Sequence, residues 1–334
     1  MKRHAVLAGT FAVLLGGLGL AGCGEPGSGG GKTQPPATGG GGTACAPVAG
    51  DRLVVLTDDK HLQNSDNVVA AFNQEFATAN PAAVEALDAV AEILDTSALV
   101  ELNKAVDLDH RTSSEVAAEF VQDNGLAAAD SSAGAGVTVV VGAANFSENA
   151  TLAEVYAAVL GSAGFSASTR TIGNRETYLP ALVSGSIQVV PEYAASLADF
   201  VNGRVNGPDA ASIADPDIGA TMAALTPLAT EQGLTLGTPS AAQDQNAFAV
   251  TTAFAEKHGV TTLSDLAATC GSALVLAGPP ECPERPFCQV GLEQTYGLRV
   301  AQFKSYDFGL IGAAIRHGDA TVGVVLSSDG SLAD

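Results

Sequence analysis

The segment that most constrains the fold is residues 137–193, where the hydrophobic periodicity changes repeatedly. It begins with a β-branched run at residues 137–141, which is typical of a buried strand. From Asn145 onward the apolar residues recur every three or four positions, which predicts a helix. We expect Asn145 or Ser147 to cap its first turn, with Glu148 completing a capping box.

The same alternation continues toward residue 193. The pattern predicts a second strand at residues 167–172, a helix at 175–183 and a third strand at 187–190. Strands that alternate with helices form a parallel sheet with helices on both faces, so the fold class is α/β. Such sheets bind ligands at the carboxyl ends of their strands. Here those ends are residues 143–147 and 191–193.

Short motifs in this region and after it occur in the order of one protein family. They are Asn145-Phe146-Ser147-Glu148, Gly173-Asn174-Arg175-Glu176, Pro191-Glu192-Tyr193, Asn246-Ala247-Phe248-Ala249-Val250-Thr251, Gly278-Pro279-Pro280-Glu281-Cys282 and Thr295-Tyr296-Gly297-Leu298. Together they resemble the binding proteins for glycine betaine, carnitine, choline and proline that serve osmoprotectant ABC transporters. The resemblance implies a type II periplasmic-binding-protein fold with two lobes.

One block of this resemblance stands out of its usual order. In the family, the strand, turn and helices found here at residues 51–126 usually follow a strand and Ser-Thr-Asp-Gly motif like the one at residues 322–330. Here the block comes first, and the Gly-rich segment 127–136 joins it to the next strand. The resemblance therefore implies a circular permutation, with Asp51 and Asp334 close together on one lobe. An assembly artefact or a truncated tandem protein is the alternative.

The permuted order also implies where the two lobes begin and end. Residues 66–251 would form one lobe, with crossover strands at 66–70 and 246–251, and residues 51–65 with 252–334 would form the other. Closure about two crossovers is the usual shape change of this architecture.

The first fifty residues have the composition of an export signal followed by a tether. Lys2 and Arg3 precede an apolar run at residues 5–20, and Leu20-Ala21-Gly22-Cys23 resembles a bacterial lipoprotein box. On this interpretation residues 1–22 are a signal peptide, Cys23 carries diacylglycerol, and residues 23–50 are a flexible tether. A transmembrane anchor is the alternative, but the run is short and Gly-rich for a bilayer span.

The charge of the chain argues against two classes of partner. The formal net charge is −21, and it becomes −23 when Lys2 and Arg3 leave with the signal. Binding to nucleic acid or adhesion to anionic lipid needs basic patches, so we expect neither.

The cysteines other than Cys23 are candidates for disulfide bonds. Cys45, Cys270, Cys282 and Cys288 allow three pairings in an oxidising compartment. We favour a bond between Cys282 and Cys288 across the Pro-Glu-Arg-Pro-Phe loop. A zinc site is the rival, but the spacings suit no zinc finger and no histidine lies nearby.

No set of residues predicts catalysis. The sequence has neither a Gly-x-Ser-x-Gly elbow nor a His-Glu-x-x-His motif, and its histidines are scattered. We expect Asp58 and Asp59 to be solvated turn residues. The expectation is a monomer that binds a small solute without a cofactor, a metal or a reaction.

The resemblance implies that tyrosine side chains bind the ligand. A quaternary ammonium is a permanent, weakly hydrated cation, and each ring face attracts it by about 0.5 to 2 kcal/mol. The family's cage positions correspond to Tyr193 and Tyr306. We expect Tyr156 and Tyr296 in the core, while Tyr178 stays undecided.

Two positions depart from the family's cage. Asn246 and Leu326 stand where cage members carry tyrosine. Losing two rings would weaken binding of a quaternary ammonium by about 1 to 4 kcal/mol, so a zwitterion held partly through its carboxylate is a further candidate ligand. The predicted ligand-binding residues are Tyr193, Tyr306, Asn145, Phe146, Asn246, Glu281 and Arg285.

These expectations together describe a lipoprotein outside the cytoplasm, anchored to the cell membrane through Cys23. It would deliver glycine betaine, choline, carnitine, proline or a related solute to the membrane permease of an ABC importer. A solute sensor or accessory binding protein with a different ligand is the alternative.

Overall fold

The computed structural model describes residues 45–271 and 274–333. These residues all belong to one compact unit of the chain, Gly41–Asp334. The expected signal peptide, residues 1–22, and the expected lipidation site, Cys23, lie outside the described residues. Across the described ranges, each helix is too short or too polar to cross a membrane.

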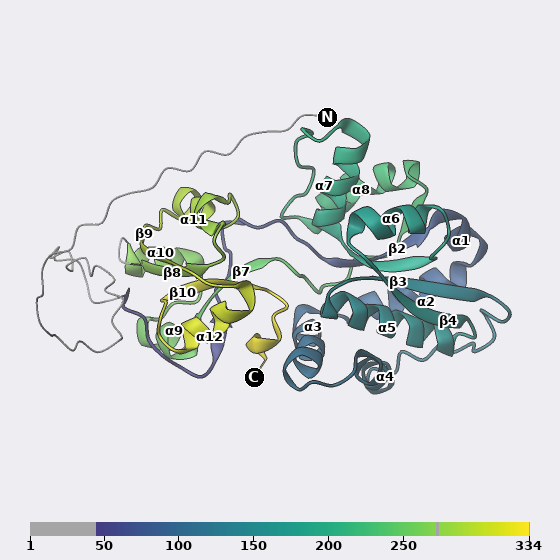
Figure 1. The fold of residues 1–334 in the computed structure, drawn as a ribbon, viewed down its shortest axis with the longest axis horizontal. Coiled ribbons are helices and arrows are strands. Elements are labelled where there is room, and N and C mark those ends of the chain that lie inside the picture. Colours follow the sequence, from purple (N-terminus) through teal and green to yellow (C-terminus); the bar gives the residue numbers. More distant parts are fainter. Residues whose placement is uncertain (1–44, 272–273, 334) are drawn as a thin grey trace, which may run out of the picture. The chain divides into compact units, whose positions relative to one another are not determined.

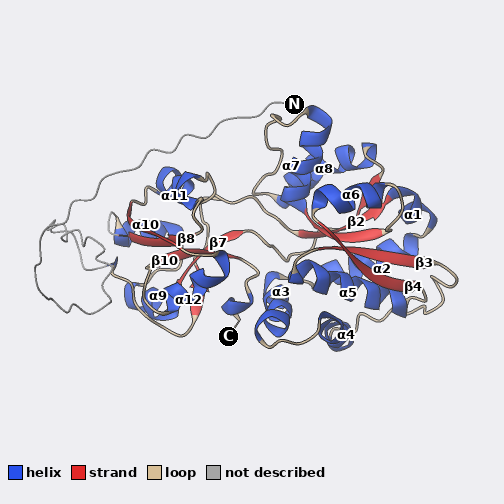
Figure 2. Ribbon diagram, in the orientation of Figure 1, coloured by secondary structure: helices blue, strands red, loops and turns tan. Residues whose placement is uncertain are grey.

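Two five-stranded sheets organise the described chain, and helices cover each of them on both faces (Figures 1 and 2). In the first sheet the strand order is β4 (Ser166–Gly173), β3 (Thr138–Ala144), β5 (Val189–Tyr193), β2 (Val68–Asn73) and β6 (Leu234–Leu236). In the second sheet it is β9 (Val300–Ser305), β8 (Leu274–Gly278), β10 (Val322–Leu326), β7 (Asn246–Thr251) and β1 (Leu53–Val55). We refer to each sheet with its helices as the first and the second lobe.

Both sheets follow the same pairing pattern. The strand β3 pairs in parallel with β4 and β5, and β8 pairs in parallel with β9 and β10. An antiparallel strand then flanks each parallel set, β2 beside β5 and β7 beside β10. This is the two-lobed periplasmic-binding-protein fold, and it confirms the predicted α/β class.

The first lobe has apolar residues on both faces of its sheet. Its helices are α1 (Gln74–Ala79), α2 (Pro81–Ile93), α3 (Thr96–Asn103), α4 (Ser113–Asp123), α5 (Ser147–Ser162), α6 (Arg175–Val183), α7 (Ala194–Asn206) and α8 (Ile218–Glu231), and the π-helix Lys104–Leu108 continues α3. On one face Leu152 and Val155 of α5 pack in the same core as Val139 and Val141 of β3. Tyr156 lies in this core, as predicted.

The second lobe has a smaller set of helices and one continuous core. Its helices are α9 (Thr252–His258), α10 (Leu263–Cys270), α11 (Gln289–Tyr296) and α12 (Ile311–Arg316). Tyr296 is buried, as predicted, and its hydroxyl donates to the carboxylate of Asp58. Asp58 also accepts from the backbone N–H groups of Leu62 and Gln63 at 2.9 and 2.7 Å. The Asp58 carboxylate therefore holds the turn together through three hydrogen bonds, and the expectation that Asp58 is only a solvated turn residue was wrong.

Two disulfides lie in the second lobe. Cys282 and Cys288 are bonded across their loop, as predicted, and Cys45 is bonded to Cys270 at the end of α10. Thr251 and Arg316 also hold the segment after Cys45, since they bond the Val48 carbonyl and the Gly50 N–H. Residues 45–50 are therefore held in the second lobe, and the predicted boundary of the tether at residue 50 was too late.

The strand β7 belongs to the second lobe. It pairs with β1 and β10, so its predicted place in a first lobe of residues 66–251 was wrong. Likewise β2 is a full member of the first sheet. The segments that pass between the sheets lie just outside these strands, where Asn67 and Gln243 form an isolated antiparallel bridge (Figure 1).

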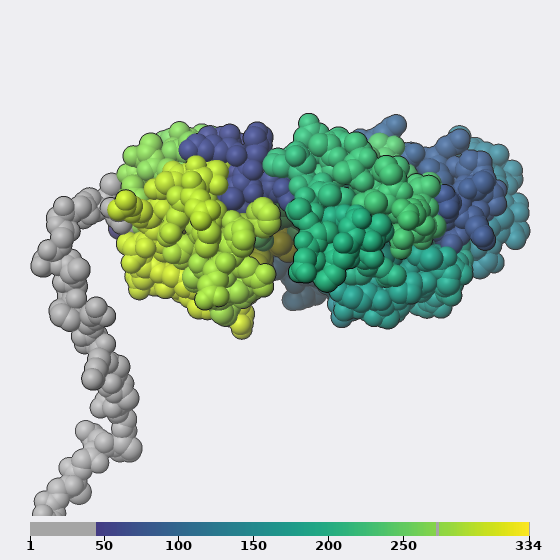
Figure 3. All heavy atoms as spheres, turned by 90° about the horizontal axis from the view of Figure 1, so that it is seen from above, coloured from purple at the N-terminus to yellow at the C-terminus, as the bar shows by residue number. Residues whose placement is uncertain are grey.

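The first and last described segments meet in the second lobe. Leu53 of β1 and Ser331 both lie beside Gly312, and Leu332 packs in the same core as Leu53. Figure 3 shows the purple residues at the start of the described chain packed among the green and yellow residues of its last third. Asp334, which we expected close to Asp51, lies outside the described residues.

Candidate functional site

Two adjoining cavities lie beside the segments that cross between the two lobes. The first measures about 310 Å³ and is lined by Ala144, Asn145, Phe146, Asn174, Arg175, Tyr178 and Tyr193 together with Asp66, Ser196 and Asp244. The second measures about 280 Å³ and is lined by Gln63, Asn64, Ala195, Asp199, Gln245, Asn246, Phe287 and Leu326 together with the same Asp66, Ser196 and Asp244. Because three residues line both cavities, we treat them as one site, the junction site.

Sheet topology explains why distant residues meet at the junction site. Asn145 and Phe146 follow the end of β3, and Tyr193 ends β5, so parallel strands deliver all three to the same edge. Asp66 and Asp244 come from the two segments that cross between the lobes. Asn246 begins β7 and Leu326 ends β10, and the two are register partners.

Tyr193 and Phe146 form the aromatic part of the first cavity. Their ring centroids lie 6.1 Å apart with a tilt of 32° between the planes. Tyr193 is only 6% exposed, while Phe146 is 45% exposed. The Tyr193 hydroxyl donates to Glu148 Oε1 at 2.6 Å, and this hydrogen bond holds the phenol ring in place.

Glu148 stands in the first turn of α5 but does not form the predicted capping box. Phe146 is the N-cap residue of this helix and makes no side-chain cap bond. Glu148 is buried and accepts instead from Tyr193 and from the Asn103 amide, and burial raises the pKa of its carboxyl. Asn103 also donates to the Ser328 carbonyl at 2.8 Å, which links α3 of the first lobe to the second.

Arg175 lines the first cavity with its charge already paired. Its Nη2 lies 2.7 Å from Glu192 Oε2, and its Nε donates to Oε1 at 3.0 Å. The Tyr178 hydroxyl donates to the same carboxylate at 2.8 Å, which settles the undecided tyrosine as part of this network. Glu192 has no exposed surface, so the ion pair is a buried one on the carboxylate side.

Asp66 and Asp244 are partly buried carboxylates shared by both cavities. Asp66 accepts from the Ser196 N–H at 3.0 Å and from the Ser196 hydroxyl, and burial raises its pKa. Asp244 accepts from the Ser328 hydroxyl at 3.0 Å. Burial, and next the negative charge of Glu148, raise the pKa of Asp244 to about 7.

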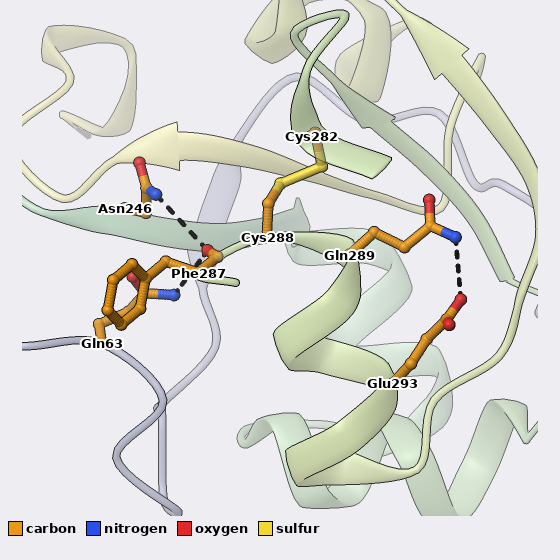
Figure 4. The surroundings of a disulfide bond; sticks show 7 residues. All are labelled: Gln63, Asn246, Cys282, Phe287, Cys288, Gln289 and Glu293. Atoms are coloured by element: carbon orange, nitrogen blue, oxygen red, sulfur yellow. Dashed lines mark hydrogen bonds between the residues drawn. A yellow bond between two sulfur atoms is a disulfide. The ribbon is translucent and has the colours of Figure 1, made fainter. Parts of the chain in front are cut away.

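The wall contributed by the second lobe is neutral and held by a cross-linked loop. The Phe287 carbonyl accepts from Gln63 Nε2 at 3.0 Å and from Asn246 Nδ2 at 3.5 Å (Figure 4). The next residue, Cys288, is bonded to Cys282. The hydrogen bonds to the Phe287 carbonyl and the adjacent disulfide hold this part of the loop, and the Phe287 side chain, which is 43% exposed, lines the second cavity.

The structure brings together only some of the predicted ligand-binding residues. Asn145, Phe146 and Tyr193 line the first cavity, and Asn246 lines the second. Tyr306 packs half-buried against the core of the second lobe, with its N–H donating to the Gly278 carbonyl, and lines neither cavity. Glu281 and Arg285 are exposed residues that flank the 3₁₀ turn Cys282–Glu284.

Sequence reasoning missed the carboxylates of the junction site. Glu192 stood inside a motif that carried the family resemblance and Asp66 inside the displaced block 51–126, but no periodicity marked either as a cavity or network residue. Asp244 and Ser196 lie in segments without any motif. Among the described residues no group of His, Cys, Asp or Glu is arranged to hold a metal ion.

The fold and the position of the cavities define a substrate-binding protein of the two-lobed periplasmic class. Residues 46–123 and 137–334 match the family of substrate-binding domains of ABC-type glycine betaine transport systems, and the chain belongs to this family. This membership confirms the resemblance, and the family is one of extracytoplasmic solute-binding proteins for ABC transporters rather than of enzymes.

One solved structure supports the fold. Apo YehZ from Escherichia coli is 23% identical with a TM-score of 0.50, over 58% of this chain and 71% of that one. A structure described as a glycine betaine/carnitine/choline ABC transporter is 18% identical with a TM-score of 0.43, over 58% of this chain and 70% of that one. A search of curated proteins finds no match.

Proposed function

We propose that the protein binds a quaternary ammonium or related compatible solute at the junction site and delivers it to the permease of an ABC importer. The observation that carries this proposal is the first cavity, where the Tyr193 and Phe146 rings stand beside the carboxylates of Asp66 and Asp244. Aromatic faces attract a weakly hydrated cation. Carboxylates at the same cavity add an attraction for positive charge.

Closure of the lobes is part of the proposal. The first lobe supplies Tyr193 and Phe146, and the second supplies Phe287 and Asn246. Tyr306, Glu281 and Arg285 would come closer to the solute only as the lobes close about the crossovers near Asn67 and Gln243. A closed, solute-bound form is the form that a permease would recognise.

A thermal-shift and calorimetry panel tests the proposal. Glycine betaine, choline, carnitine, proline betaine, ectoine and proline are the candidate ligands, and at least one quaternary ammonium should bind and raise the unfolding temperature. Binding of an unrelated sugar or peptide in place of all of these would contradict it.

Two variants of Tyr193 separate its ring from its hydroxyl. Tyr193→Phe keeps the face that attracts the cation and removes only the bond to Glu148, while Tyr193→Leu removes the face. We expect Tyr193→Leu to weaken binding by about tenfold and Tyr193→Phe to change it much less. Equal losses would show that the ring is not a ligand contact.

The proposal includes a lipid anchor at Cys23. The support is the sequence alone, because Leu20-Ala21-Gly22-Cys23 resembles a lipoprotein box. Cys23→Ser should move the protein from the membrane fraction to the soluble fraction and abolish labelling by a fatty-acid analogue. Retention in the membrane fraction would favour an uncleaved anchor.

The circular permutation is likewise a proposal. Two observations support it: the family match omits residues 124–136, and Leu53 packs in the same core as Leu332. A rearranged chain that runs from residue 137 to 334 and continues into residues 45–126, so that Cys45 can still pair with Cys270, should fold and bind the same solute. Failure of this chain to fold would contradict the proposed order.

A further inference from the structure

We infer that the junction site selects a monocation that carries no carboxylate, and that Asp66 and Asp244 make this selection. The inference rests on the proposed function, because it names the class of solute that the same site takes. It separates choline-like cations from glycine betaine, whose ammonium is accompanied by a carboxylate.

The positions of the two carboxylates are fixed by the main chain. Asp66 and Asp244 lie on the two crossing segments, and the Asp244 N–H donates to the Asp66 carbonyl at 3.1 Å. Both residues line both cavities. A solute that enters either cavity therefore meets the same pair of acids.

The positive charge at the junction site is already paired with a buried carboxylate of the protein. Arg175 is the one cationic residue among those that line the two cavities, and Glu192 binds it through two nitrogens. Besides Asp66 and Asp244, the remaining charged lining residue is Asp199, whose carboxylate accepts from the Ser212 hydroxyl and the Ile213 N–H. A solute carboxylate would have to compete with buried Glu192 for Arg175 while facing Asp66 and Asp244.

The N-terminus of α5 does not provide another binding position for a solute carboxylate. A helix N-terminus generally favours an anion, and residues 145–147 line or adjoin the first cavity. Glu148, however, places a buried carboxyl in the first turn of this helix. A second carboxylate there would be repelled by Glu148 and by Asp244.

Cations and zwitterions should therefore bind with different strength. Two charges a few ångströms apart in a partly buried site interact far more strongly than in water, so each acid helps a cation and opposes a nearby carboxylate. We expect choline to bind at least about tenfold more tightly than glycine betaine.

Calorimetry at pH 8, above the pKa of about 7 that Asp244 has in the solute-free protein, tests the inference with choline and glycine betaine on the wild-type protein and on Asp66→Asn/Asp244→Asn. The double variant should bind choline about 100-fold more weakly, while its affinity for glycine betaine stays the same or rises. Asp123→Asn, which removes an exposed acid at the end of α4, is the matched control and should change neither affinity.

The possible results separate the inference from the proposed function. A preference of the wild-type protein for glycine betaine, or an equal loss for both solutes in the double variant, would overturn the inference and leave the function intact. Binding of no quaternary ammonium at all would overturn the proposed function and the inference with it. If the double variant does not fold, the two single variants provide the same comparison, with about tenfold loss of choline affinity each.

Discussion

The two lobes share one strand pattern but contribute different walls to the junction site. In the first lobe the wall is charged and aromatic, with Tyr193 fixed by Glu148 and Arg175 paired to Glu192. In the second lobe the wall is neutral, with Asn246 and Phe287, and the lobe is cross-linked by two disulfides. The same fold therefore supports two different sources of rigidity.

On the proposed function, this difference assigns ligand selectivity to the first lobe and covalent stabilisation to the second. The first lobe fixes its binding groups through buried ionic and hydrogen-bonded networks, so changes there should alter both folding and ligand choice. The second lobe fixes its wall through covalent bonds, so single polar changes there should matter less. Each prediction below probes one side of this comparison.

The largest effect is expected from the disulfide that closes the longer loop. Cys45 and Cys270 are 225 residues apart, while Cys282 and Cys288 are 6 apart, and all four side chains are buried. Loop-closure entropy predicts a loss of about 5 kcal/mol for Cys45→Ser/Cys270→Ser and about 2 kcal/mol for Cys282→Ser/Cys288→Ser. Urea unfolding of both variants measures the difference, and equal losses would contradict it.

The ion pair in the first lobe should have the next largest effect. Arg175→Met leaves the fully buried carboxylate of Glu192 without its cation, which should cost about 3 to 5 kcal/mol. Arg111→Met breaks the exposed pair with Glu119 and should cost at most about 1 kcal/mol. If urea unfolding shows the same loss for both variants, the network does not stabilise the first lobe.

Asp244 should make the stability of the solute-free protein depend on pH. Its folded pKa, about 7, lies above the ordinary value of 3.8 because of burial and of the nearby Glu148, Asp66 and Asp329. The folded protein therefore holds this proton more tightly, and the stability it contributes is lost as the pH rises from about 4 to 7.

Asp244→Asn isolates this contribution. The wild-type protein should lose on the order of 1 to 2 kcal/mol more than Asp244→Asn between pH 5 and pH 8, allowing for partial solvent screening. Denaturant titrations at the two pH values measure it. Parallel losses in the two proteins would show that Asp244 ionises normally.

The smallest effect is expected from the neutral wall. Phe287→Ala removes an exposed ring at the second cavity and should weaken choline binding by about threefold, while leaving its preference over glycine betaine unchanged. Leu310→Ala, an exposed apolar residue of the same lobe that lines neither cavity, is the control. A change in preference would mean that the second lobe also selects the solute.

The α/β class and several elements could be predicted from sequence because their signals are local, whereas the two-lobed architecture followed only from the family resemblance. The hydrophobic periodicity predicted a helix at residues 175–183, the observed bounds of α6, and it predicted that Tyr156 lies in the core. The third strand was predicted at residues 187–190 but lies at Val189–Tyr193. The sequence Pro191-Glu192-Tyr193 is too polar to be predicted as a buried strand, and Glu192 is buried there because it pairs with Arg175.

The site was less accessible to sequence reasoning because it depends on tertiary contacts. Asp66 and Asp244 become a pair only when the two crossing segments bond to each other, far apart in the chain. The capping box at Glu148 was a sound local prediction that failed because Tyr193 and Asn103 compete for the same carboxyl. Tyr193 was located correctly as a strand-end residue, whereas Tyr306 lines neither cavity.

A crystal structure with bound choline tests the central claim most directly. The account predicts the ammonium group at the junction site, against the Tyr193 ring and within reach of the carboxylates of Asp66 and Asp244. Choline bound elsewhere, for example in the cavity lined by Val100 and Leu332, would contradict it.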